Sequence, residues 1–133
     1  MAADIPSLGD DRPPRKGRLL DNAAVMETSP GAVRRFMDAA ARRDYDAIGD
    51  CFTDDATVRD EGKTRRGREE IRQWQRETRA TWDYTATVVS GRQDGEHRYR
   101  LGVHLHGNFP GGDADVEYRF TIRDELISRL QVE

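Results

Sequence analysis

The sequence predicts an α+β domain in which three helices precede an antiparallel β-sheet. In the helical part, apolar residues recur at the three- and four-residue spacing of amphipathic helices. In the second half of the chain, apolar and polar residues alternate, which is the pattern of half-buried strands. The segments "GRQDGE" and "NFPGGD" are turns that join these strands as antiparallel neighbours. Helices followed by a meander are typical of a sheet that has one face covered by helices.

Each predicted helix begins at a residue suited to a helix N-terminus. Ser29 can cap the first helix, which starts at Pro30 and ends near Arg43. Asp44 caps a second, short helix, and Gly67 opens the third. The inward residues of the three helices are Val33, Phe36, Met37 and Ala40, then Tyr45, Ile48, Cys51 and Phe52, then Ile71, Trp74 and Thr78.

Four alternating segments follow, at residues 82–89, 99–106, 116–123 and 126–133. The first three each offer a complete apolar face, because strand side chains alternate between the two faces of a sheet. These faces consist of Trp82, Tyr84, Ala86 and Val88; Tyr99, Leu101, Val103 and Leu105; and Val116, Tyr118, Phe120 and Ile122. In the last segment the alternation alone does not decide the face of Leu126, Leu130 and Val132. If these residues lie on the outer face, they favour a dimer.

The opposite face of the sheet is predicted to be charged. Such opposed charges suit cross-strand pairs that face water or a symmetric partner subunit. The two-residue spacing of His104 and His106 could ligate a metal, but no acidic or cysteine cluster accompanies them, so we interpret them as surface or interface residues. The other polar residues of this face are Arg98 and Arg100 on one strand and Glu117, Arg119, Thr121 and Arg123 on the next.

Length and composition indicate one domain without a membrane span. Residues 1–28 mix prolines, glycines and charges without periodicity and are predicted to be a flexible extension, which leaves residues 29–133 as the domain. No apolar run reaches the roughly 18 residues of a membrane span, and no signal peptide is apparent, so a cytoplasmic protein is expected. The single Cys51 excludes an internal disulfide and a thiolate-rich metal site. The net charge of −3, with both signs interspersed, argues against a nucleic-acid partner.

The stretch "DDATVRDEG" contains the candidate functional carboxylate. If it is a strand, Ala56, Val58 and Asp60 share one face, which places a carboxylate beside two apolar residues. In one interpretation Asp60 is desolvated at an apolar pocket and acts as a base. In the other, Asp60 caps backbone N–H groups of the following loop and is neutralised by Arg59 or Arg66.

The segment "FTDDATVRDEGKTRRGREEIRQW" resembles the nuclear transport factor 2-like superfamily, in particular the SnoaL-like cyclases and the ketosteroid isomerases. The resemblance covers residues 30–133 and implies a cone in which three helices pack on a strongly bent antiparallel sheet. It also implies a homodimer formed through the outer face of that sheet. The superfamily includes isomerases, cyclases, dehydratases and proteins that only bind or dimerise, so the resemblance implies a fold more than one activity.

Ketosteroid isomerases use an Asp base and an oxyanion hole made of a Tyr and a protonated Asp. By resemblance the base corresponds to Asp60, but the oxyanion tyrosine corresponds to Phe36, its supporting tyrosine to Gln75, and the second acid to Val116. Loss of one oxyanion donor typically costs about two to three orders of magnitude in rate. Ketosteroid isomerase activity by the family mechanism is therefore not expected. The acidic residue that SnoaL-like cyclases carry on the last strand has no counterpart here, because that strand offers Ser128, Arg129 and Gln131.

The sequence thus predicts a pocket for a small apolar molecule, with Asp60 as the catalytic acid/base of an isomerase, cyclase or dehydratase. The alternative is a non-catalytic ligand-binding or dimerisation module of the same fold. No organic cofactor or metal is implied. A buried phenol seeks a hydrogen-bond partner, so a tyrosine could replace the missing oxyanion donor; the candidates are Tyr84, Tyr99 and Tyr118. The residues predicted to bind the substrate are Phe36, Trp74, Tyr84, Tyr99, Val103, Val116 and Tyr118.

Overall fold

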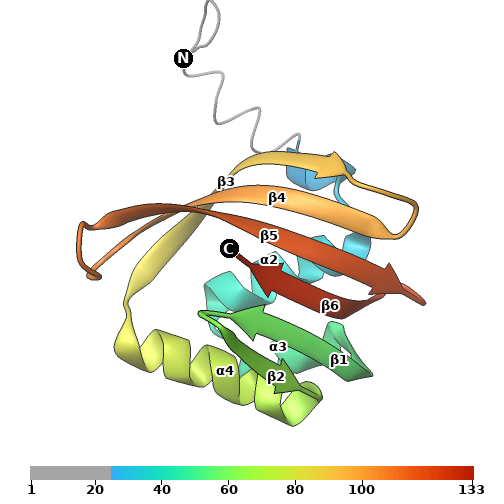
Figure 1. Cartoon of the computed structure of the whole chain (residues 1–133), viewed down its shortest axis with the longest axis horizontal. Coiled ribbons are helices and arrows are strands. Elements are labelled where there is room, and N and C mark those ends of the chain that lie inside the picture. Colours follow the sequence, from blue (N-terminus) through green and yellow to red (C-terminus); the bar gives the residue numbers. More distant parts are fainter. Residues whose placement is uncertain (1–24) are drawn as a thin grey trace, which may run out of the picture.

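The structure, a computed structural model, describes residues 25–133 and confirms the predicted α+β architecture. Three helices and six strands follow one another in the order α2 (Gly31–Arg42), α3 (Tyr45–Asp50), β1 (Phe52–Asp60), β2 (Lys63–Arg66), α4 (Arg68–Thr81), β3 (Tyr84–Gln93), β4 (Arg98–Gly107), β5 (Asp113–Arg123) and β6 (Leu126–Val132). The strands form one curved sheet in the order β2-β1-β6-β5-β4-β3, with the helices gathered against one side (Figure 1). None of these helices is long and apolar enough to cross a membrane.

Most of the predicted N-terminal extension lies outside the described residues. Residues 25–28 form a turn of helix, and Val25 and Met26 pack against the core. Residues before position 29 therefore take part in the packing.

The helix boundaries agree with the predictions except at two points. The first is the N-terminus of α2, and the second is the C-terminus of α3, which ends at Asp50, so that Phe52 belongs to β1 and not to the helix. The N-cap of α2 is Pro30, which makes no side-chain cap, and the Ser29 hydroxyl instead lies 2.7 Å from the Val25 carbonyl oxygen. The helix ends at Arg43, whose φ of 57° is left-handed. The predicted Asp44 cap is confirmed, because its carboxylate accepts from the Ala47 N–H at 3.1 Å.

The sheet contains the predicted meander of β3 to β6 and one strand that was not predicted. The segment Lys63–Arg66 pairs as β2 with β1 in an antiparallel hairpin. Glu61 and Gly62, at the turn, both have positive φ, 53° and 78°, as a tight two-residue hairpin requires. Beyond this hairpin, β1 runs parallel to β6, with Val58 opposite Leu130.

A β-bulge in β6 decides the face that the alternation left open. Ile122 pairs with Ile127 while Thr121 pairs with Arg129, so Ser128 is an extra residue in the ladder. The bulge lets Ile127 and Leu130 share the core although their spacing is odd, and each is at most 1% exposed. Leu130 therefore gives no support to an apolar dimer surface on the outer face.

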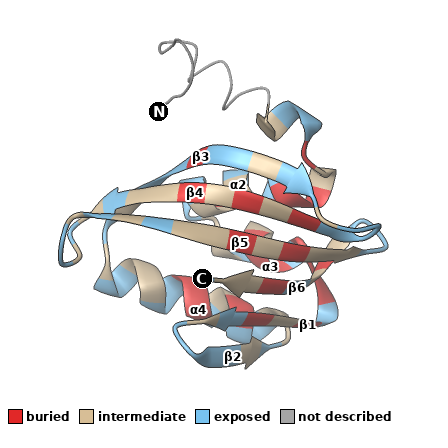
Figure 2. Cartoon of the chain, turned by 45° about the horizontal axis from the view of Figure 1, so that its top comes forward, coloured by how far each residue is buried: buried red, intermediate tan, exposed pale blue. Residues whose placement is uncertain are grey.

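The core is centred on Phe36 of α2. Its ring meets Phe52 edge-on at 5.6 Å and Phe120 at 5.9 Å, and it stacks on Trp74 at 6.5 Å with an interplanar angle of 3°. Buried residues concentrate on the central strands, whereas the edge strands β2 and β3 are largely exposed (Figure 2). Cys51 is buried, as predicted, and burial raises the pKa of its thiol.

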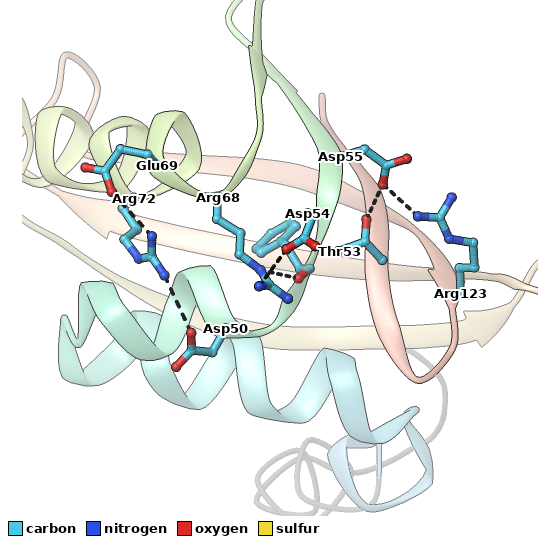
Figure 3. A network of polar contacts seen from close by, with 9 residues as sticks. Asp50, Thr53, Asp54, Asp55, Arg68, Glu69, Arg72 and Arg123 are labelled. Carbon is cyan, nitrogen blue, oxygen red and sulfur yellow. Dashed lines mark hydrogen bonds and ion pairs between the residues drawn. The ribbon is translucent and has the colours of Figure 1, made fainter.

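The acidic residues at the start of β1 belong to a structural network of ion pairs (Figure 3). Asp54 binds Arg68 of α4 at 2.7 Å, and Arg68 also donates to the Phe52 carbonyl oxygen at 2.8 Å. Asp55 accepts from Arg123 of β5 at 2.6 Å and from the Thr53 hydroxyl at 2.9 Å. These two carboxylates therefore attach β1 to α4 and to β5.

Charged pairs cover the outer face of the sheet, as predicted. His104 of β4 lies 2.7 Å from Asp115, directly opposite on β5, and 3.0 Å from Asp113. Arg100 lies 3.6 Å from Glu117 across the same two strands. The hydrogen bonds to Asp115 and Asp113 raise the pKa of His104. Homodimer formation through this face stays a prediction.

Phe36→Ala is expected to lower the free energy of unfolding by about 3–5 kcal/mol, because it removes the ring on which the other core aromatics pack. Urea denaturation measures this loss. Val89→Ala, at a side chain that is 41% exposed, is the control and should change stability by less than about 0.5 kcal/mol. A cost near that of the control would show that Phe36 does not organise the core.

The His104 cluster is expected to make stability depend on pH. The folded protein binds this proton more tightly than the unfolded chain, so the contribution is complete below the unfolded pKa of about 6.5 and is lost as pH rises through the raised folded pKa. Urea denaturation across this range should show wild type losing stability relative to His104→Gln. His97→Gln, at an exposed histidine, is the control. Parallel curves for wild type and His104→Gln would contradict the assignment.

Candidate functional site

Asp60 is the last residue of β1 and lies at the inner face of the sheet. The predicted alternation is confirmed, since Ala56 and Val58 are fully buried and Asp60 is partly buried beyond them. The indole N–H of Trp74 in α4 donates to Asp60 Oδ2 at 3.0 Å. In residues 25–133 this is the one hydrogen bond made by the Asp60 side chain, and no arginine pairs with it. Neutralisation by Arg59 is not seen, because Arg59 is exposed and binds the Thr64 hydroxyl at 3.1 Å.

A pocket of about 510 Å³ opens beside Asp60, between α4 and the inner face of the sheet. Its wall combines large aromatic rings with a few polar groups, as small-molecule sites usually do. The lining residues are Asp60, Glu61, Gly62, Trp74, Thr78, Trp82, Tyr84, Leu105, Phe109, Ala114, Val116, Tyr118, Val132 and Glu133.

The structure brings five of the eight predicted site residues together and places three elsewhere. Phe36 and Val103 are 1% exposed in the core and do not line this pocket. Tyr99 lies under the N-terminal end of α2, where its hydroxyl is 3.3 Å from the Ser29 hydroxyl. The five that line the pocket are Asp60, Trp74, Tyr84, Val116 and Tyr118.

Two tyrosine hydroxyls are available in this pocket. Tyr84 of β3 and Tyr118 of β5 line it, and neither hydroxyl makes a hydrogen bond to any residue of the described part of the chain. Burial is the main cause that raises the pKa of both phenols, and the negative charge of Asp60 adds to it. Both groups therefore stay protonated near neutral pH and can donate a hydrogen bond.

A second hollow, of about 670 Å³, lies between α2, α4 and β3 on the other side of these tyrosines. Tyr84 and Tyr118 line both spaces, whereas Phe36 and Gln75 line the second alone. The Arg79 guanidinium covers the Tyr84 ring at 4.0 Å and donates to the Tyr84 carbonyl oxygen at 2.8 Å. These contacts fix Tyr84 as part of the wall between the two spaces.

Several pocket residues were not predicted. Trp82 was assigned to a strand face, but it caps the C-terminal end of α4, and its ring packs edge-on against Phe109 at 6.2 Å. Phe109 belongs to the "NFPGGD" turn, where a large apolar residue in a polar segment was the available signal. Val132 lines the pocket because the bulge in β6 sets which face of the sheet it lies on.

No group of three or more His, Cys, Asp or Glu side chains in residues 25–133 is placed to hold a metal ion. The histidines of the outer face instead bind carboxylates of β5, as described above.

The model of the SnoaL-like domain matches residues 33–130. The chain belongs to this family. No curated protein matches it. The match spans most of α2 and all of the sheet except the last residues of β6, so it covers Asp60 and most of the pocket lining.

Solved structures agree with this family. A proposed polyketide cyclase from Sinorhizobium meliloti is 30% identical, with a TM-score of 0.78, and the similarity covers 81% of this chain and 98% of that one. A protein from Catenulispora acidiphila with a ketosteroid isomerase-like fold, solved in complex with trimethylamine, is 25% identical, with a TM-score of 0.69 and coverage of 80% and 86%. A nuclear transport factor 2-like protein from Cytophaga hutchinsonii, 16% identical, shares the fold, with a TM-score of 0.63 and coverage of 77% and 85%.

Tyr118→Phe and Tyr99→Phe are expected to differ in their effect on stability. Tyr118 makes no hydrogen bond to the described residues. Removal of its hydroxyl should therefore lower the free energy of unfolding by less than about 0.5 kcal/mol. Tyr99→Phe breaks the contact with Ser29 and should cost about 0.5–1.5 kcal/mol. Urea denaturation of both variants makes the comparison. An equal or larger cost at Tyr118 would mean that its hydroxyl is already engaged.

Proposed function

We propose that the protein catalyses a cofactor-independent proton transfer on a small, mostly apolar carbonyl compound, with Asp60 as the general base. The observation that carries the proposal is that Asp60 and two unengaged phenols line one aromatic pocket. A base and a hydrogen-bond donor on opposite sides of a bound carbonyl compound are the minimum that enolisation requires.

In the proposed reaction Asp60 removes a proton from the carbon beside the carbonyl, and the C–H electrons pass to the carbonyl oxygen. Tyr118, with Tyr84 beside it, donates a hydrogen bond to the enolate oxygen that forms. In a β,γ-unsaturated substrate, return of the proton to the γ-carbon of the dienolate gives an isomer. In a β-hydroxy substrate, delivery of the proton to the departing hydroxyl gives water and an α,β-unsaturated carbonyl compound. Attack of the enolate carbon on a second carbonyl of the same molecule closes a ring, and the proton passes to the alkoxide that forms. Each outcome belongs to the isomerase, dehydratase and cyclase classes that the sequence suggested.

The contacts of Asp60 support its role as a base. The Trp74 N–H occupies Oδ2 and fixes the carboxylate, which leaves Oδ1 without a partner among residues 25–133. An orienting hydrogen bond of this kind limits the conformations that a base must search before it reacts. The relation to a proposed polyketide cyclase supports the same class of chemistry, because ring closure of a polyketide proceeds through an enolate.

The two phenols can also replace the hydrogen-bond donors that ketosteroid isomerases have at the positions of Phe36 and Val116 and that this chain lacks there. Phe36 packs in the core, and Val116 contributes only apolar surface to the pocket. Tyr118 lies two residues after Val116 on the same strand, so it projects from the same inner face. We infer that donation to the oxyanion has moved from the family positions to the tyrosines of β3 and β5.

Exchange of solvent deuterium into the α-carbon of small ketones and 1,3-diketones, followed by proton NMR, tests this function. Asp60→Asn retains an oxygen that can accept from Trp74 and should slow exchange by about 10²–10⁴-fold, because it removes the base. Tyr118→Phe should slow exchange by up to about 10²–10³-fold. Glu96→Gln, at an exposed carboxylate outside the pocket lining, is the control and should stay close to wild type.

Turnover that survives in Asp60→Asn would reject the base. A wild-type protein that binds such compounds without exchanging their protons would instead support the non-catalytic binding module.

A further inference from the structure

The charges of the Asp60 pocket are unbalanced. Its lining includes the side chains of Asp60 and Glu61, and neither forms an ion pair with any of residues 25–133. No lysine, arginine or histidine is among the described residues that line it. Glu133 also lines the pocket, but its carboxylate lies 3.5 Å from Arg119, on the outer face. The pocket therefore holds two negative charges without a positive one.

The rest of the wall consists largely of electron-rich rings. Trp82 and Phe109 pack edge to face at one end of the pocket, and Trp74 and Tyr118 line it nearer the core. Faces of such rings attract cations within about 6 Å of their centroids, and the attraction grows when the cation is removed from water. Rings around an unpaired carboxylate form the usual receptor for a quaternary or tertiary ammonium group.

One arginine lies on the other side of the wall that Tyr84 forms. Arg79 lies over the Tyr84 ring, in the second hollow, and its guanidinium is held by the carbonyl oxygens of Tyr84 and Ala40. Arg79 already uses the Tyr84 ring, so the other four rings and Asp60 are the groups left for a ligand. Tyr84 therefore separates the Asp60 pocket, which is negatively charged, from the second hollow, which contains the positive charge of Arg79.

We propose that the Asp60 pocket selects a ligand with a positively charged, alkylated nitrogen. An anion would meet repulsion from Asp60 and Glu61, and a neutral molecule would leave both charges without a partner. This inference rests on the proposed function for its site and deepens it by naming the substrate class, a carbonyl compound that carries an ammonium group. An ammonium substituent also acidifies neighbouring C–H bonds, which suits a carboxylate base.

The test uses two probes of equal shape, choline and its uncharged carbon analogue 3,3-dimethylbutan-1-ol, titrated into the whole protein by calorimetry and by NMR of the tryptophan indoles. Wild type should bind choline at least about tenfold more tightly than the neutral probe. Asp60→Asn, which keeps an acceptor for Trp74, should remove most of this preference without lowering the affinity for the neutral probe. Trp82→Leu should lower the affinity for choline more than the affinity for the neutral probe.

Glu96→Gln is the matched control, because Glu96 is an exposed carboxylate on the turn between β3 and β4, outside the pocket lining. Equal affinity for the two probes in wild type, or a preference that survives in Asp60→Asn, would overturn the inference. That result is separate from the proposed function, which stands or falls on deuterium exchange. Loss of exchange in Asp60→Asn together with equal probe affinities would retain the base and reject the cationic substrate.

Discussion

The parallel pairing of β1 with β6 is the constraint on which the rest of the structure depends. In the described part of the chain it is the one strand pairing that joins the meander to the segment before α4. The register sets Val58 opposite Leu130, and both are buried at the centre of the domain. Because side chains alternate along a strand, a buried Val58 also directs Asp60 inward, toward Trp74. The pairing of β1 with β6 therefore brings the core residues together and also directs the Asp60 carboxylate inward.

Core packing and the site share Trp74. Its ring stacks on Phe36 while its indole N–H binds Asp60, so the packing of α4 on α2 also fixes the position of the carboxylate. A phenylalanine at position 36 takes part in this stack but has no hydroxyl to donate a hydrogen bond. The inner face of β5 can offer another donor at little cost in packing, because Tyr118 is buried along its ring and still lines the pocket. The chain therefore has a carboxylate at the end of β1 and two phenols on the meander in one pocket.

The sequence could predict what depends on local periodicity. Helices, meander and the inward direction of Asp60 all follow from spacings of three, four or two residues, and the structure has each of them. It could not predict what depends on a break in periodicity or on distant contacts. The bulge at Ser128 reverses the faces of β6, and the hairpin at Glu61 needs a non-glycine residue at positive φ. The placement of Tyr99 beside Ser29 depends on the path of the chain before α2, which periodicity does not describe.

The unpaired groups around Asp60 are the strongest reason to regard the pocket as functional. The ion pairs of Asp54 and Asp55 show that this chain readily provides arginine partners for carboxylates elsewhere. At Asp60, only a tryptophan N–H is provided, although arginines are abundant nearby in β2. An arginine directed inward would neutralise Asp60. The pocket instead leaves a carboxylate oxygen and two phenols that a ligand can engage.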